Sequence, residues 1–139
     1  MNAELSIRLF RLSAIGLLVF ATIWITAAIP GFDRPGKLLI DMLDWPLDGN
    51  HNELSQDARW LSAIGAGLTA SLGVMLLLVV VPGLKAGIAS VRSGALIAIT
   101  VWYVVDSVGS VTAGVPSNAF FNTIFYLALV IPLWMARTD

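Results

Sequence analysis

The chain has 139 residues, of which 58% are hydrophobic and 12% charged, and its formal net charge is −1. A soluble domain is typically about 45–50% apolar and about 25% charged, so this composition leaves too little charged surface to cover a globule in water. The small net charge excludes a broad basic surface for nucleic acid. The absence of cysteine excludes disulfides, thiolate metal sites and a cysteine nucleophile. The composition therefore predicts one domain whose solvent is lipid.

Four long apolar segments predict four transmembrane helices, because about 20 mainly apolar residues cross the hydrocarbon core. Their continuous apolar character disfavours a β-barrel, whose strands alternate between lipid and lumen. We therefore expect an all-α membrane protein, a four-helix bundle forming a single domain over residues 1–139. The expected spans are residues 12–29, 60–81, 94–113 and 118–136.

The first span leaves one alternative open. Arg8 and Arg11 precede it and small residues stand at positions 26–28, an arrangement that is also typical of a secretory signal peptide. The uncharged run from Leu12 to Ala28 is 17 residues long, whereas the apolar region of a signal peptide usually has about 7–15. This length favours a retained helix; cleavage would leave three spans.

The loop of residues 31–59 is the one long polar segment. Apolar residues at positions 38, 39, 42 and 43 have helical spacing, and Asp41 and Asp44 fall on the opposite face. This pattern predicts a short amphipathic helix over residues 36–45 that lies at the membrane interface, over the outer ends of the bundle. Its expected role is a cover, and the alternatives are a docking surface or the roof of a site.

Two further features of this loop concern single residues. Ser55 is expected to be the N-cap of the following helix, because its hydroxyl suits the unpaired amides there. His51 is the sole histidine, and without a second ligand at helical spacing it is expected to be solvated. No metal site and no cofactor are predicted.

The second span carries two adjacent rows of small residues at i, i+4 spacing. Small residues let helix backbones approach closely, which matters in lipid because no hydrophobic effect drives the helices together. The predicted packing residues are Ser62, Gly65, Ala66, Thr69 and Gly73.

The third span contains one ionisable residue, Asp106. At about 1.5 Å per residue it lies about 10 Å below the outer end of its helix. An intramembrane carboxylate is costly and is expected to face the bundle interior, where it is a candidate functional group.

Other polar residues have the spacing to join Asp106. Ser110 lies one turn away and Tyr103 flanks the same face, while Asn118 and Asn122 repeat the i, i+4 spacing on the last span. The short connection makes the last two helices antiparallel neighbours. The predicted cluster is therefore Asp106, Ser110, Asn118, Asn122 and Tyr103, with Arg59 at the start of the second span as the expected partner of the carboxylate.

Two interpretations of the cluster remain open. The structural one is that its hydrogen bonds hold helices together, each worth about 0.6–2 kcal/mol. The functional one is that it forms the floor of an outward-facing pocket or part of a proton path.

The distribution of cations predicts the orientation. Arg8, Arg11, Lys85, Arg92 and Arg137 fall on one side of a four-span chain, against Arg34, Lys37 and Arg59 on the other. The five-to-three excess places both termini in the cytoplasm, with the protein in the cell (inner) membrane.

The sequence has no phosphate-binding loop, dinucleotide fingerprint, zinc-protease motif or serine nucleophile elbow. The leading expectation is therefore a non-enzymatic accessory, scaffold or assembly subunit. Its expected partners are the lipid bilayer and a second copy or another membrane protein, and not nucleic acid. The alternative is a small oligomeric transporter or proton-coupled permeation protein built around Asp106. An enzyme ranks third, because it would rely on Asp106, Tyr103 and Asn122 alone.

Overall fold

The computed structural model describes residues 3–49 and 53–136, and every regular element within those residues is a helix. Four helices are long and apolar enough to cross a membrane, as the sequence predicts: Ala3–Ala28, Gln56–Lys85, Ala89–Thr112 and Pro116–Met135. The first consists of α1 (Ala3–Trp24) and the 3-10 turn η1 (Ile25–Ala28). The second consists of α3 (Gln56–Met75), the π turn η2 (Leu76–Val80) and α4 (Val81–Lys85), while α5 (Ala89–Thr112) and α6 (Pro116–Met135) form the others.

The helices extend beyond the predicted spans. The first begins at Ala3 rather than at residue 12, and its early residues Ile7 and Phe10 are buried in the core. The second continues through Pro82 to Lys85 rather than ending at residue 81. A proline interrupts α-helical hydrogen bonding, and here it follows a wider turn in which the amide of Val81 bonds to the carbonyl of Leu76. Hydropathy therefore marks the uncharged part of each helix, and packing decides where the helix ends.

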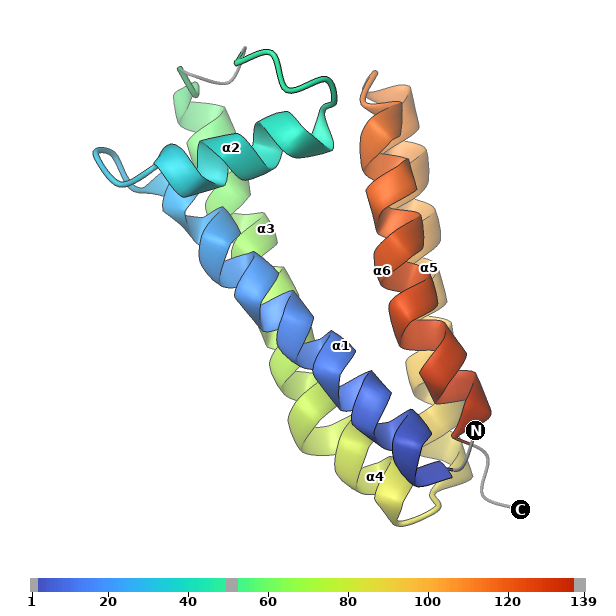
Figure 1. The fold of residues 1–139 in the computed structure, drawn as a ribbon. Helices are drawn as coiled ribbons and strands as arrows, with labels where there is room; N and C mark the ends of the chain where they lie inside the picture. The colour runs from blue at the N-terminus through green and yellow to red at the C-terminus, as the bar shows by residue number, and fades with distance from the viewer. Residues whose placement is uncertain (1–2, 50–52, 137–139) are drawn as a thin grey trace.

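The long helices form two pairs that converge at one end (Figure 1). α1 packs along α3 and α5 packs along α6, and the pairs meet at the end where α4, the start of α1 and the end of α6 lie. All four long helices contribute to the apolar core at this end, whose fully buried side chains include Phe10, Leu76, Ile99, Leu129 and Leu133. The pairs separate toward the opposite end, which α2 (Arg34–Leu43) crosses.

The turn between α5 and α6 fixes their antiparallel arrangement. Gly114 has φ +88°, a conformation that side chains with a Cβ disfavour. The amide of Val115 bonds to the carbonyl of Ser110 (2.9 Å) and the amide of Gly114 to that of Val111 (3.1 Å). These two bonds form a Schellman cap that closes α5, and Pro116 then occupies the first turn of α6, where a missing amide costs nothing.

α2 is attached to the rest of the fold by close backbone contact. Gly36 is buried, and a Cβ placed there would lie 2.3 Å from the backbone nitrogen of Ala27. The chain then reaches α3, where the Ser55 hydroxyl accepts a hydrogen bond from the amide of Ala58 (3.1 Å). The predicted N-cap of α3 is confirmed.

Candidate functional site

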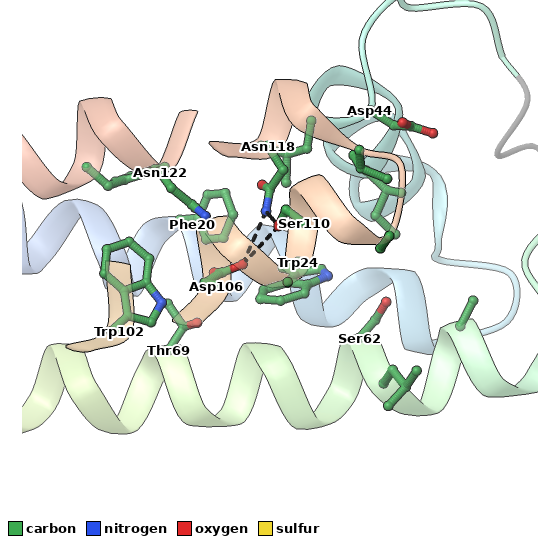
Figure 2. Close-up of a pocket in the computed structure, with 18 of the residues that line it drawn as sticks. Phe20, Trp24, Asp44, Ser62, Thr69, Trp102, Asp106, Ser110, Asn118 and Asn122 are labelled. Atoms are coloured by element: carbon green, nitrogen blue, oxygen red, sulfur yellow. Dashed lines mark hydrogen bonds between the residues drawn. The ribbon is translucent and has the colours of Figure 1, made fainter. Parts of the chain in front are cut away.

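A cavity of about 570 Å³ lies between the α1–α3 pair and the α5–α6 pair, on the side where α2 crosses the fold (Figure 2). Small-molecule sites usually occupy about 300–1,000 Å³. Apolar side chains make up most of the wall, and no lysine or arginine is among the described lining residues. The polar lining residues are Asp44, Ser62, Thr69, Asp106, Ser110, Asn118 and Asn122.

Three polar side chains form a hydrogen-bonded group on this wall, which we call the Asp106 cluster (Asp106, Ser110 and Asn118). Ser110 Oγ donates to Asp106 Oδ1 at 3.2 Å, and Asn118 Nδ2 donates to the same oxygen at 3.3 Å and to Ser110 Oγ at 2.8 Å (Figure 2). Within the described residues, Asp106 Oδ2 accepts no hydrogen bond and no cation pairs with the carboxylate. Asp106 therefore presents an unused acceptor beside the cavity.

Asn122 lies on the same wall but is not hydrogen-bonded to the Asp106 cluster. It is one helical turn beyond Asn118, its residue is 5% exposed, and its Nδ2 has no hydrogen-bond partner within the described residues. Figure 2 shows the side-chain nitrogen directed toward the ring of Phe20, another lining residue. An unpaired buried donor is rare in folded proteins, so Asn122 offers a donor that no acceptor among the described residues uses.

Tyr103 lies apart from the cavity lining. Its hydroxyl is 3.0 Å from Thr123 Oγ1, and its ring stacks on Tyr126 with a centroid distance of 4.4 Å. The Tyr126 hydroxyl is in turn 3.2 Å from Thr100 Oγ1. Tyr103 thus joins α5 to α6 at a level different from that of the Asp106 cluster.

The predicted pairing of Arg59 with Asp106 is wrong. Arg59 Nη2 lies 2.7 Å from Asp33 Oδ2, and Arg59 Nη1 donates to the carbonyl of Ala27 at 3.2 Å. Lys37 Nζ lies 3.0 Å from the same Asp33 oxygen. Hydrogen bonds from Lys37 and then Arg59 lower the pKa of Asp33 below its ordinary value. Arg59 stands in the first turn of α3, where the loop folds Asp33 against it, so the nearby carboxylate takes the cation.

The predicted helix over residues 36–45 is present as α2, but its two acidic residues do not lie on a solvent-exposed face. The Asp41 carboxylate is buried, and its two oxygens accept from the amide of Gly49 at 3.3 and 3.2 Å. Asp44 lines the cavity, while Leu38 is 62% exposed. The segment after α2 folds back and gives Asp41 a backbone donor. Sequence periodicity does not predict this contact.

α2 forms one wall of the cavity and is held at both ends. Ile40 and Leu43 line the cavity beside Asp44. Ser117 Oγ, at the start of α6, donates to the carbonyl of Leu43 at 2.7 Å. This bond ties the last turn of α2 to the α5–α6 pair, whereas Gly36 holds its first turn against η1.

The small-residue rows of α3 face α1 and the cavity. A Cβ on Gly65 would lie 2.3 Å from the ring of Trp24, and one on Gly73 would lie 2.8 Å from Leu18. These glycines allow α1 and α3 to approach closely. Of the remaining predicted packing residues, Ser62 and Ala66 are buried, and Ser62 and Thr69 also line the cavity.

Sequence reasoning missed the aromatic wall of the cavity. The Phe20 ring contacts Trp24 and Phe125 edge-on, with centroid distances of 5.8 and 5.1 Å, and all three line the cavity with Trp102. The i, i+4 spacing of Phe20 and Trp24 places them on one helix face, but apolar spacing alone does not separate a cavity wall from a core.

Two residues used in the sequence predictions, His51 and Arg137, lie outside the described residues. Within the described residues, no group of three His, Cys, Asp or Glu side chains is arranged to hold a metal ion.

No protein-family model, curated protein or solved structure matches the chain. The inference of function therefore depends on the cavity and on the residues that line it.

Proposed function

We propose that the chain is a small multi-pass membrane protein that binds an amphipathic small molecule in the cavity between its helix pairs and carries it through the membrane. The observation that supports this function best is the cavity of about 570 Å³ beside the unused Oδ2 of Asp106. An ionisable group within a span usually marks a substrate or proton path. The geometry thus favours the carrier over the accessory subunit that the sequence alone favours.

The proposed membrane placement rests on the outward surface. Leu68, Leu78 and Val105 are each between 67% and 71% exposed, and a surface so apolar is unfavourable in water. In the proposed arrangement the four long helices cross the bilayer as a bundle and α2 lies at the outer interface. The cations at the core end, including Lys85 and Arg92, favour a cytoplasmic position for that end and for both termini, in the cell membrane.

Single cysteines test this orientation cleanly, because the chain has none of its own. A membrane-impermeant thiol reagent applied to intact cells should label Asp48→Cys, beyond α2, and not Ala86→Cys, between α4 and α5. The reverse labelling pattern would refute the orientation, and labelling of both residues at equal rates would refute the membrane placement.

Ligand binding is tested by thermal unfolding of the purified protein in detergent with amphiphilic amines, acids and uncharged compounds. A ligand at 100 times its dissociation constant stabilises the folded state by about 2.7 kcal/mol, which raises Tm measurably. Thr69→Trp fills the cavity from α3 and should abolish the rise. Ser71→Trp adds a comparable side chain to an exposed position of the same helix and should preserve it.

A rise that Thr69→Trp removes and Ser71→Trp retains supports binding in the cavity. The proposal fails if no compound of any of the three charge classes raises Tm, or if both variants behave alike. Transport is then tested by measuring the release of the binding compound from proteoliposomes. Equal release from protein-free liposomes would refute transport.

An accessory or oligomeric role is a second candidate, favoured by the exposure of α5. This helix is the least buried of the four long helices, and its outward face carries Val101, Val104, Val105 and Val108. A second copy or another membrane protein would cover this face. Purification from native membranes should then give a stoichiometric complex or a homo-oligomer, and a monomer without partners would refute this role.

A further inference from the structure

We infer that the ligand of the cavity is an organic cation, a protonated amine attached to an aromatic or other apolar body. This inference deepens the proposed function and rests on it. Charge, hydrogen bonding and the aromatic wall each point to the same class of ligand.

The charges on the wall have one sign. Asp44 and Asp106 line the cavity, and none of the described lining residues is cationic. The nearest basic candidate in the sequence, Arg59, is engaged by Asp33. An anionic ligand would meet the like charge of Asp106 in a medium of low dielectric constant, where repulsion is strong. An uncharged ligand would leave Asp106 unpaired, whereas a cation compensates this partly buried carboxylate.

The hydrogen-bonding capacity of the wall selects the form of the cation. Among the residues that the structure describes, Asp106 Oδ2 is an acceptor without a donor, and a protonated amine supplies an N–H that makes a strong charge-assisted bond. Asn122 Nδ2 is a buried donor without an acceptor in the same part of the chain. Asn118 and Asn122 are one turn apart, about 6 Å along α6. The complementary ligand therefore carries its amine at Asp106 and an oxygen or nitrogen acceptor several ångströms away.

The apolar part of the ligand matches the rest of the wall. Phe20, Trp24 and Phe125 form a continuous aromatic surface, and Trp102 lines the cavity from α5. Aromatic faces attract cations and stack on aromatic ligands.

Propranolol is a suitable probe, because it combines a naphthalene ring, a secondary amine and two oxygen acceptors. N-acetylpropranolol keeps the body and removes the charge, and 1-naphthoxyacetate replaces the cation by an anion. Binding is measured by equilibrium dialysis of the full-length protein in detergent, with protein-free micelles subtracted. Propranolol should bind at least 10-fold more tightly than either analogue.

Variants assign the binding to the named atoms. Asp106→Asn should weaken propranolol binding at least 10-fold and leave N-acetylpropranolol within 2-fold. Asn122→Leu, which keeps the branching pattern of the side chain and removes the donor, should weaken propranolol 3- to 10-fold. Ser107→Ala is the matched control on α5, because Ser107 does not line the cavity and its buried hydroxyl has no partner within the described residues; it should bind as the wild type does.

The possible outcomes separate the cation inference from the proposed function, which is ligand binding in the cavity. Equal affinity of the wild type for the three probes would overturn the cation inference without the use of any variant, while leaving the cavity as a binding site. Retained propranolol affinity in Asp106→Asn would do the same. Binding of none of the probes would overturn the cation inference, and the wider compound set used for Tm then decides separately whether the cavity binds another class.

Discussion

The close contact between α2 and η1 can be tested by a glycine-to-alanine substitution. Close packing and helix propensity predict opposite changes in the free energy of unfolding. Gly36→Ala adds a Cβ 2.3 Å from the backbone nitrogen of Ala27, and ordinary contact begins at about 3.4 Å. α2 must therefore move outward by about 1 Å. Overpacking of this kind typically costs about 1–3 kcal/mol, whereas alanine in place of glycine in a helix gains up to about 1 kcal/mol. The net change should be destabilising.

Gly67→Ala is the matched control, because a Cβ at this exposed position of α3 meets nothing within 4 Å. It should be neutral or stabilising. Helix propensity largely cancels between the two variants, so their free energies of unfolding should differ by about 1–3 kcal/mol. The assay is equilibrium unfolding in mixed micelles of increasing SDS content, followed by tryptophan fluorescence. If Gly36→Ala is as stable as Gly67→Ala, the close contact that holds α2 is refuted.

Three further predictions concern polar contacts outside the Asp106 cluster. The pKa of Asp33 is lowered in the folded state, so its ion pairs contribute stability above its ordinary value of 3.8 and lose it as the pH falls below that value. Asp33→Asn should lack this acid-dependent part of unfolding between pH 6 and 2, and an unchanged pH profile would contradict the assignment. Ser117→Ala removes the bond to the Leu43 carbonyl and should cost about 0.5–1.5 kcal/mol in the same SDS titration; no loss would mean that this bond does not hold α2. Tyr103→Phe removes the contact with Thr123 and should cost about 0.6 kcal/mol without changing propranolol affinity, and a weakened affinity would place Tyr103 in the binding site after all.

The local parts of the structure could be predicted from the sequence because they depend on short-range spacing. Asp106 and Ser110 share a face because they are one turn apart, and the tight turn at Gly114 brings Asn118 opposite them. Ser55 caps α3 through an amide only three residues away. In each case, the partner lies within about one helical turn or one tight connection.

The predictions that were wrong concern contacts that depend on how the loop of residues 31–59 folds. Arg59 has several acidic residues within reach in the sequence, and only the folded position of Asp33 decides which one it pairs with. Asp41 becomes buried because Gly49 returns to it across the loop. Neither contact has a regular spacing that could be recognised in the sequence. A cavity volume cannot be predicted in this way either, because it depends on the separation of the helices rather than on their composition.

The apolar core joins the two helix pairs at one end only. A rotation of one pair relative to the other would therefore have its axis, or pivot, at that end. A helix of 20 residues is about 30 Å long, so a rotation of 5° about the pivot displaces its far end by roughly 2.5 Å. Side chains such as Leu76 and Ile99 lie at the pivot, while the cavity lies along the arms. A change of side-chain volume at these positions should therefore alter the width of the space beside Asp106, and the bond between Ser117 and α2 should limit that change at the end opposite the core.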